Sequence, residues 1–221
     1  TFGDANPSVA NYLQYFGLVA NNVDKIKFTD NWNVLTNESS MVSFPEKTNS
    51  NQYLQLGAGY TQLTASYPGK IGWNNYDIYG FAVYKNKTRS QLWDLNAAGK
   101  LYLNGFHSGD FDAQASLSRI LSKKGTYLQF SFQNINRTPS QNMLGYTQFL
   151  IKGLTAINKE NATIVNGVLA NKKLGWEASA SYQMIQNYNY FSSGYQAAVY
   201  TKPISYISTV LANKIKLSKH W

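Results

Sequence analysis

Long stretches of two-residue alternation constrain this chain more than any other feature of its sequence. In residues 91–104 every second residue is apolar or small, and most residues between them are Asp, Asn or Lys. Residues 174–186 repeat the pattern, with only Ile185 out of phase. Such alternation indicates β-strands with one apolar and one polar face. Both segments are also longer than the roughly five or six residues usual in soluble strands.

Weaker versions of the same pattern occur along most of the chain. They predict strands at residues 52–64, 110–118 and 126–134, and noisier ones at residues 78–87, 163–171, 195–201 and 206–217. The first fifty residues give no clear register, and helical periodicity is weak everywhere, strongest over residues 146–156. We predict about nine to eleven strands. No linker of low complexity divides them, so residues 1–221 are predicted to form a single domain.

The composition removes several classes of protein. The longest apolar runs, residues 81–84 and 197–200, are far shorter than the roughly 20 residues of a transmembrane helix. The chain has no Cys and only His107 and His220, so it lacks disulfides and thiolates and offers little imidazole for catalysis or zinc binding. We therefore expect no enzyme, no metal site and no cofactor.

Strands with two different faces fit either a soluble sandwich or an outer-membrane barrel. In the soluble fold Leu95, Leu101, Leu128 and Trp176 would pack together in a dry centre, whereas in the barrel they would face lipid. The polar faces contain mainly Asn, Gln, Ser and Thr rather than Lys and Glu, and the strands are long, which favours the membrane. Aromatic residues near the segment ends are typical of interfacial girdles: Trp93, Tyr102, Tyr127, Trp176, Tyr188, Tyr190 and Phe191. We predict an all-β fold, an antiparallel meandering transmembrane β-barrel or a partial barrel or fragment of a larger one.

Two motifs of paired strands occur in a recognisable order. Residues 92–121 (LWDLNAAGKLYLNGFHSGDFDAQASLSRIL) contain an alternating strand, a glycine turn with Gly109-Asp110-Phe111, and a second alternating strand. Residues 174–191 (LGWEASASYQMIQNYNYF) contain a strand followed by Asn187-Tyr188-x-Tyr190, and VLANKIKL follows at residues 210–217. In this order, over residues 52–217, the motifs resemble the putative porin family of Bacteroidetes-type bacteria.

The sequence also departs from that family's pattern. After residues 137–140 the resemblance leads us to expect an aromatic-rich stretch with Trp and Asn, but the chain has QNMLGYTQF. Members of the family are longer, with more strands. The last residues, KIKLSKHW, have Leu217 and Lys219 where a barrel-closing strand would have further aromatics. We therefore expect the barrel domain to be incomplete at one or both ends.

The resemblance implies a β-barrel in the outer membrane of a Gram-negative bacterium, a channel for passive diffusion of small hydrophilic solutes. The partners it implies are outer-membrane lipid and lipopolysaccharide, the solutes, and a protein partner in the envelope. It implies no catalytic residues; Gly109-Asp110-Phe111 would mark a turn into a strand and Asn187-Tyr188-x-Tyr190 an interfacial turn. Two alternatives remain: a barrel subunit accessory to a larger envelope uptake or secretion complex, and a soluble β-rich glycan-binding module.

Two features of the sequence, a cluster of triad residue types and a positive net charge, are also found in hydrolases and in nucleic-acid-binding proteins. His107, Ser108 and Asp110 are the residue types of a hydrolytic triad, but a triad is assembled from separated parts of a fold, and this cluster lies in a glycine-flanked turn. The net charge of +9 is suited to an anionic partner. Its lysines cluster at the breaks between strands, for example Lys123-Lys124 and Lys172-Lys173, which fits lipid phosphates better than a nucleic-acid groove. We expect no nucleic-acid partner.

The polar faces of the predicted strands carry the candidate functional residues. In a barrel these faces line the lumen, where side-chain charge tunes which solutes pass. The alternative is that they only hydrate the interior without selectivity, and the sequence leaves both open. The predicted pore-lining residues are Asp94, Asn96, Lys100, Asp112, Gln114, Glu177, Ser179 and Gln183.

Overall fold

A computed structural model describes residues 2–3, 25–26, 30–66, 72–88, 90, 92–146, 153–154, 156, 158–192 and 196–214 of the chain. These residues form strands and turns, and none of them is helical. No helix in this part of the chain is long and apolar enough to cross a membrane. The strands are β1 (Phe2–Gly3), β2 (Lys25–Ile26), β3 (Asn31–Ser43), β4 (Gln52–Ser66), β5 (Trp73–Lys87), β6 (Trp93–Gly105), β7 (Phe111–Ile120), β8 (Thr126–Arg137), β9 (Glu160–Asn171), β10 (Trp176–Gln186), β11 (Tyr188–Phe191), β12 (Ala197–Tyr200) and β13 (Ile204–Asn213).

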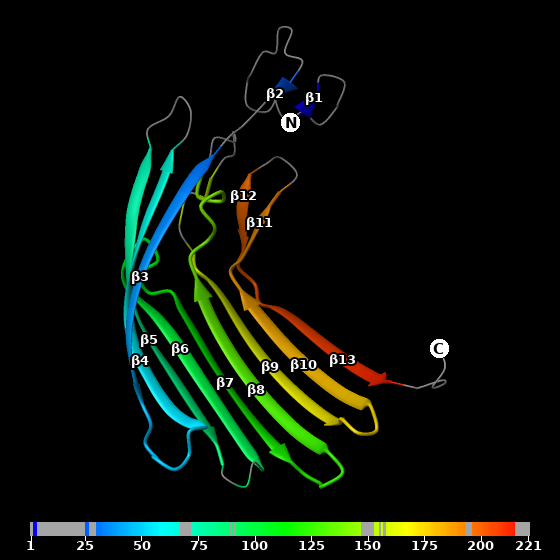
Figure 1. Ribbon diagram of the computed structural model, residues 1–221. Helices are drawn as coiled ribbons and strands as arrows, with labels where there is room; N and C mark the ends of the chain where they lie inside the picture. Colours follow the sequence, from blue (N-terminus) through cyan, green and yellow to red (C-terminus); the bar gives the residue numbers. More distant parts are fainter. Residues whose placement is uncertain are drawn as a thin grey trace.

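Nine strands form one curved antiparallel sheet in the order β13-β10-β9-β8-β7-β6-β5-β4-β3 (Figure 1). From β3 to β10 each strand pairs with its neighbour in the sequence. The chain then leaves the sheet for the small β11–β12 hairpin and returns as β13 beside β10. Within the described residues the sheet is open, with β3 and β13 at its edges. This confirms the predicted all-β antiparallel meander, in the form of a partial barrel.

The strands predicted from alternation lie where expected. Residues 91–104 correspond to β6 and residues 174–186 to β10, which begins at Trp176. The unregistered N-terminal region contains β3, a full strand of the sheet. Most of the segment with weak helical periodicity, residues 146–156, lies outside the described residues.

Two glycines in β4 let aromatic rings lie flat across the sheet. Gly57 and Gly59 are the direct partners of Phe81 and Tyr79 in β5. A Cβ atom on either glycine would lie 2.3 Å from the ring of its partner. A side chain at either position would therefore displace the ring, and glycine in a strand here marks a close approach rather than a weak point.

The pairing of β5 with β6 contains a bulge between Ile78 and Tyr79. Beyond it, Gly105 ends β6 with φ of +105°, where a Cβ atom would lie 1.9 Å from the carbonyl oxygen of Tyr76. Only glycine fits this combination of backbone angle and close contact. The bulge and the glycine together bend the end of β6 into the turn that carries residues 106–110.

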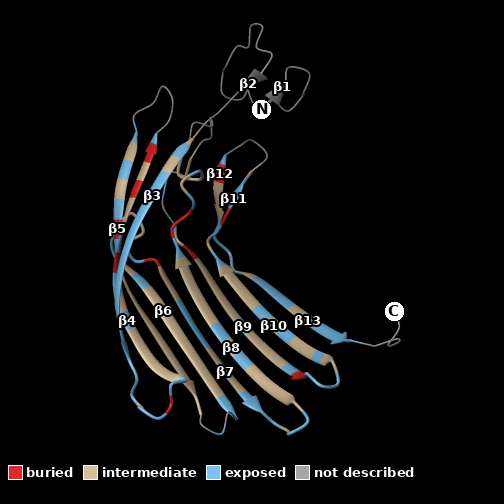
Figure 2. Ribbon diagram, viewed as in Figure 1, coloured by how far each residue is buried: buried red, intermediate tan, exposed pale blue. Residues whose placement is uncertain are grey.

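Few side chains of the sheet are buried, as Figure 2 shows. Among the described residues the buried hydrophobic side chains are Leu63, Ala65, Tyr79, Ala170 and Ala197. Large apolar side chains are instead exposed, for example Phe130 at 55% and Leu211 at 86%. Leu95, Leu101, Leu128 and Trp176 lie on the same side of the sheet as Phe130 and Leu211 and are not buried. A soluble sandwich would have covered them, so this sheet presents its apolar side to its surroundings.

Candidate channel surface

The register of the sheet sorts its side chains into two faces of opposite chemistry. One row of directly paired residues crosses six neighbouring strands and contains only Asn and Ser. We call it the Asn/Ser row: Asn96, Ser116, Ser131, Asn166, Ser181 and Ser208. Within it the Asn166 side-chain amide donates to Ser131 Oγ at 3.2 Å. An uncharged hydrogen-bonding belt therefore runs across this side of the sheet, which we call the polar face.

The row one residue further along each strand is entirely apolar. It crosses the same six strands on the opposite side of the sheet, which we call the apolar face: Ala97, Ala115, Phe132, Val165, Tyr182 and Ile207. Because neighbouring residues of a strand point to opposite sides, a shift of one residue in any strand would mix these rows. The rows agree across six strands, so the alternation in the sequence and the pairing of the structure support the same register.

All eight predicted pore-lining residues lie on the polar face. Lys100 is paired directly with Asp112, and Asn96 belongs to the Asn/Ser row. Gln114 and Gln183 share one row through Gln133 and Ile164. A second row joins Asp94 to Ser179, and Glu177 follows on the same side of β10.

The polar face is more shielded than the apolar face. In β8 its side chains Gln129, Ser131 and Gln133 are half-buried, whereas Phe130 and Phe132 between them are exposed. The hollows of the surface beside Lys100 and beside Asn96 are lined mainly by residues of the polar face. Side chains on the inner side of a curved sheet shield one another, so the polar face is the concave side. Apolar outside and polar inside is the arrangement of a transmembrane barrel.

Charged groups in the middle of the polar face are held by a set of side-chain contacts. Tyr79 is 1% exposed, lies across Gly59 and donates its hydroxyl to Glu38 Oε1 at 2.6 Å. Lys100 Nζ lies 3.6 Å from the centre of the Tyr79 ring, a cation–π contact. Asp112, opposite Lys100, accepts from the Gln133 amide at 3.1 and 3.3 Å. Two carboxylates and one ammonium thus line one hollow on the concave side.

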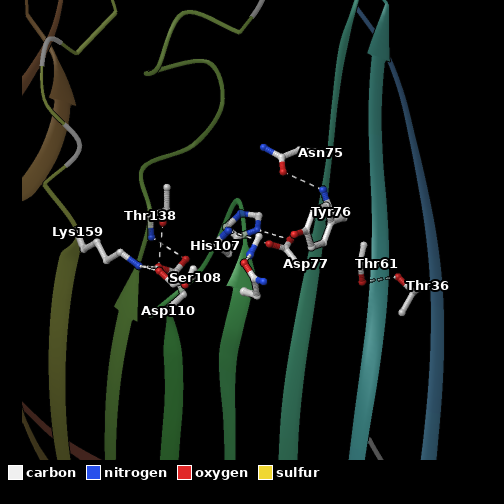
Figure 3. Close-up of polar contacts among 12 residues, drawn as sticks. Thr36, Thr61, Asn75, Tyr76, Asp77, His107, Ser108, Asp110, Thr138 and Lys159 are labelled. Carbon is white, nitrogen blue, oxygen red and sulfur yellow. Dashed lines mark hydrogen bonds and ion pairs between the residues drawn. The ribbon is translucent and has the colours of Figure 1, made fainter.

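A second set of charges lies at one end of the sheet, which we call the loop-side rim. At this end the strands are connected by residues 106–110, 138–159 and 187–203. Asp77, near this end of β5, is 2% exposed. It accepts from the backbone N–H of His107 at 2.7 Å and lies 2.6 Å from His107 Nδ1 (Figure 3). The carboxylate therefore fixes the turn between β6 and β7 to the neighbouring strand.

Two further buried carboxylates continue this rim. Asp110 accepts from the backbone N–H and hydroxyl of Thr138 at 2.8 and 2.9 Å, and from Lys159 Nζ at 2.7 Å (Figure 3). Glu160 pairs with Arg137 and accepts from the backbone N–H of Asn189 at 3.2 Å. Each carboxylate joins segments far apart in the sequence. At this rim the carboxylates of Asp77, Asp110 and Glu160 are thus buried and each is bound by neighbouring side-chain and backbone groups.

The residues that resemble a triad do not form one. The His107 ring bonds Asp77, whereas Asp110 bonds Thr138 and Lys159. Ser108 Oγ donates to the carbonyl oxygen of Leu103. The prediction that this segment is a turn is confirmed, with Gly109 at φ of +81° leading through Asp110 into β7.

The predicted aromatic girdle divides between the two faces. Trp93 and Trp176 begin β6 and β10 on the apolar face, and Arg119 lies 4.7 Å from the Trp93 ring. Tyr102 and Tyr127 lie on the polar face, so their assignment to a lipid-facing girdle is wrong. Position near a segment end indicated an interface, but only the register shows which side a ring occupies. The motif at Tyr188 and Tyr190 forms β11 of a second hairpin rather than a single turn.

Sequence reasoning missed Glu38, Asp77 and Tyr79. Glu38 lies in the region with no clear register, and Asp77 just precedes the predicted strand of residues 78–87. Their partners are 30 or more residues away, so no local pattern reveals them. The two glycines opposite Tyr79 and Phe81 were the available signal, because paired glycines in a strand indicate close packing.

The polar face offers amides, hydroxyls and charged groups to whatever lies against it. In the part of the chain that the structure describes, no cluster of three or more His, Asp or Glu side chains could hold a metal ion.

A family model described as "Putative porin" matches residues 5–221, nearly the whole chain. The chain belongs to the putative porin family. No curated protein and no solved structure matches it. For this porin-family chain, membership indicates a porin-like, non-enzymatic function and, in general terms, an outer-membrane location.

Proposed function

We propose that this porin-family chain forms the wall of an outer-membrane channel through which small hydrophilic solutes diffuse passively. The observation that carries the proposal is the pair of adjacent rows, one of Asn and Ser on the concave side and one apolar on the outside. Apolar side chains can face hydrocarbon at little cost in free energy. The polar row provides a hydrated surface on which a solute can replace hydrogen bonds to water by hydrogen bonds to Asn and Ser. Passage of this kind makes or breaks no covalent bond and needs no cofactor.

The eight polar-face residues are proposed to line this path. Lys100 is the one to test first, because it lines the same hollow as the carboxylates of Glu38 and Asp112. Fixed charges at close quarters bias which ions enter a pore. Asn96, Gln114, Ser179 and Gln183 would hydrate the path, and Asp94 and Glu177 would add negative charge toward one end.

The test is ion conductance across a planar bilayer into which the purified chain is reconstituted. Lys100→Glu replaces the ammonium by a third carboxylate, so the reversal potential in a salt gradient is expected to shift toward cation selectivity. Lys123→Glu makes the same charge change in an exposed turn between β7 and β8 and is expected to shift it much less. An equal effect of the two variants would remove Lys100 from the path. No conductance from the unmodified chain would overturn the channel itself.

The membrane location has an independent test. The chain is expected to sediment with the outer-membrane fraction of its cell and to require detergent for extraction, because its apolar face offers large side chains to lipid. A chain that stays in aqueous buffer after lysis would instead support a soluble β-rich module. Conductance that appears only in the presence of a co-purifying protein would identify an accessory subunit.

A further inference from the structure

A continuous line of aromatic rings runs along the concave side from the loop-side rim toward the middle of the sheet. Trp32 and Trp73 meet above Ala65, with ring centres 5.5 Å apart. From Trp73 the centre-to-centre distances between successive rings are 5.0, 4.8, 5.5 and 5.3 Å. We call this line the aromatic lane: Trp32, Trp73, Phe106, His107, Tyr102 and Tyr79. All its rings except Tyr79 are half-buried, so part of each remains exposed, and Trp73 is half-buried with Tyr146 also packed on it, the two ring centres 5.4 Å apart.

The lane leads to the uncharged part of the polar face. From Tyr102, successive polar-face positions of β6 are Lys100, Ala98 and Asn96, the first member of the Asn/Ser row. Beside Asn96 lies a hollow lined by amides and hydroxyls that include Gln114, Ser131 and Gln133. Stacking surfaces at the rim and hydrogen-bonding groups further in are thus parts of one connected surface.

The charged side chains along this route already have partners. Asp77 is bound by His107, and Glu38 accepts from the Tyr79 hydroxyl. Lys100 lies over the Tyr79 ring, and Asp112 accepts from Gln133. A charged solute would have to displace these contacts, whereas an uncharged one would leave them intact. The route is therefore complementary to a neutral ligand with flat apolar faces and many hydroxyls.

We propose that the aromatic lane and the Asn/Ser row form a binding track for neutral oligosaccharides. A sugar ring has an apolar C–H face that packs on an aromatic ring, and its rim of hydroxyls both donates and accepts hydrogen bonds. Asn and Ser side chains offer donors and acceptors in the same way. The proposal rests on the proposed channel function and names the class of solute that the channel would take.

Isothermal titration calorimetry on the full chain, folded in detergent, tests the binding. The probes are maltoheptaose, xylohexaose and mannohexaose, together with a charged galacturonic acid oligomer. At least one neutral oligomer is expected to bind saturably. Trp73→Leu is expected to weaken that binding about tenfold, as loss of one stacking platform does for other ring-shaped ligands. Trp73→Phe, which keeps a ring, should retain most of it.

The matched control is Trp93→Leu, a tryptophan at the opposite end of the strands and on the apolar face. It should leave binding unchanged, and every variant should keep the far-UV circular dichroism spectrum of the parent at the temperature of the titration. Absence of saturable binding to every neutral oligomer, equal binding by Trp73→Leu, or binding of the charged oligomer alone would overturn the track.

Conductance distinguishes failure of the track from failure of the channel. Ion conductance in sugar-free buffer with no neutral-sugar binding would leave the channel and remove the track. Sugar binding by a chain that does not conduct would support the track as a recognition surface and contradict passage through it. If both hold, the bound oligomer should block the ion current in the parent and much less in Trp73→Leu.

Discussion

The connections at the two ends of the strands are stabilised by different interactions. At the loop-side rim Asp77, Asp110 and Glu160 are buried, and each is bound by groups from a distant segment. At the other end, the short-turn rim, residues 121–125 and 172–175 form tight turns closed by local bonds, such as Gly125 N–H to Ser122 O and Lys173 N–H to the Asn171 side chain. Their lysines, Lys123 and Lys124 among them, are exposed.

The difference lies in where the acceptors for the turn backbone come from and not in turn length alone, because residues 106–110 and 121–125 are both five-residue connections. A tight turn satisfies its own backbone donors and acceptors, so its side chains are free to be chosen for solubility or for lipid phosphates. Where a connection leaves a backbone N–H group without a local acceptor, a buried carboxylate from a distant segment can accept from it. Asp77, Asp110 and Glu160 each accept a backbone N–H, from His107, Thr138 and Asn189. The loop-side rim is therefore predicted to be sensitive to substitution and the short-turn rim tolerant.

The largest effect is expected for Asp110→Ala. It removes three bonds at once, which leaves the Thr138 N–H without its described acceptor and Lys159 with only the Ser108 carbonyl oxygen. Loss of one member of a fully buried ion pair costs about 3–5 kcal/mol, and because the Lys159 side chain is 29% exposed we expect the lower end of that range. The free energy of unfolding, from urea titration of the chain in lipid, should fall by that amount. Asp112→Ala, which loses only an amide partner, should cost clearly less; equal losses would contradict the special role of the rim.

A smaller effect is expected for Arg137→Ala. The Arg137 side chain is itself mostly exposed, but its partner Glu160 is buried and would keep only the Asn189 N–H among its described partners. We expect a loss of about 1–3 kcal/mol, the cost of leaving a buried acceptor partly unsatisfied. The same urea titration measures it. If Arg137→Lys restores full stability, a single positive charge is enough and the two-pronged contact is not required.

The smallest effect is expected for Lys123→Ala combined with Lys124→Ala. Both side chains are exposed in the turn between β7 and β8, and surface substitutions of this kind change stability by less than about 0.5 kcal/mol. A loss comparable to that of Arg137→Ala would abolish the contrast between the rims. Binding to vesicles with anionic headgroups is a separate measurement in which the double variant is expected to be weaker.

The regular part of the fold was predictable from sequence because polar and apolar residues alternate within each strand in the middle of the sheet. In β6 the alternation of Asp94, Asn96 and Lys100 with Leu95, Ala97 and Leu101 is enough to assign sides. The register places all eight polar residues on one side of the sheet. Their proposed role in lining a channel is a matter for the conductance test.

Strand β3 was not predictable, and its side chains show why. Its apolar-face positions include Asn33, Asn37 and Ser39, while Val34 and Val42 lie on the polar face. Local alternation therefore does not separate two kinds of face, and only pairing with β4 fixes its register. The ion pairs of the rim were hidden for a different reason, because their members lie far apart in the chain and meet only after the strands have paired.

The meander has a consequence for how such a wall can be assembled. Because strands β3 to β10 each pair with the strand before them in the chain, growth can proceed hairpin by hairpin along one advancing border. No segment has to thread between two that are already joined, and each step closes only a modest loop. Such an assembly adds strands one after another instead of forming all contacts at once. We expect the slowest step to be the pairing of β13 with β10, because the β11–β12 hairpin separates these two strands in the chain.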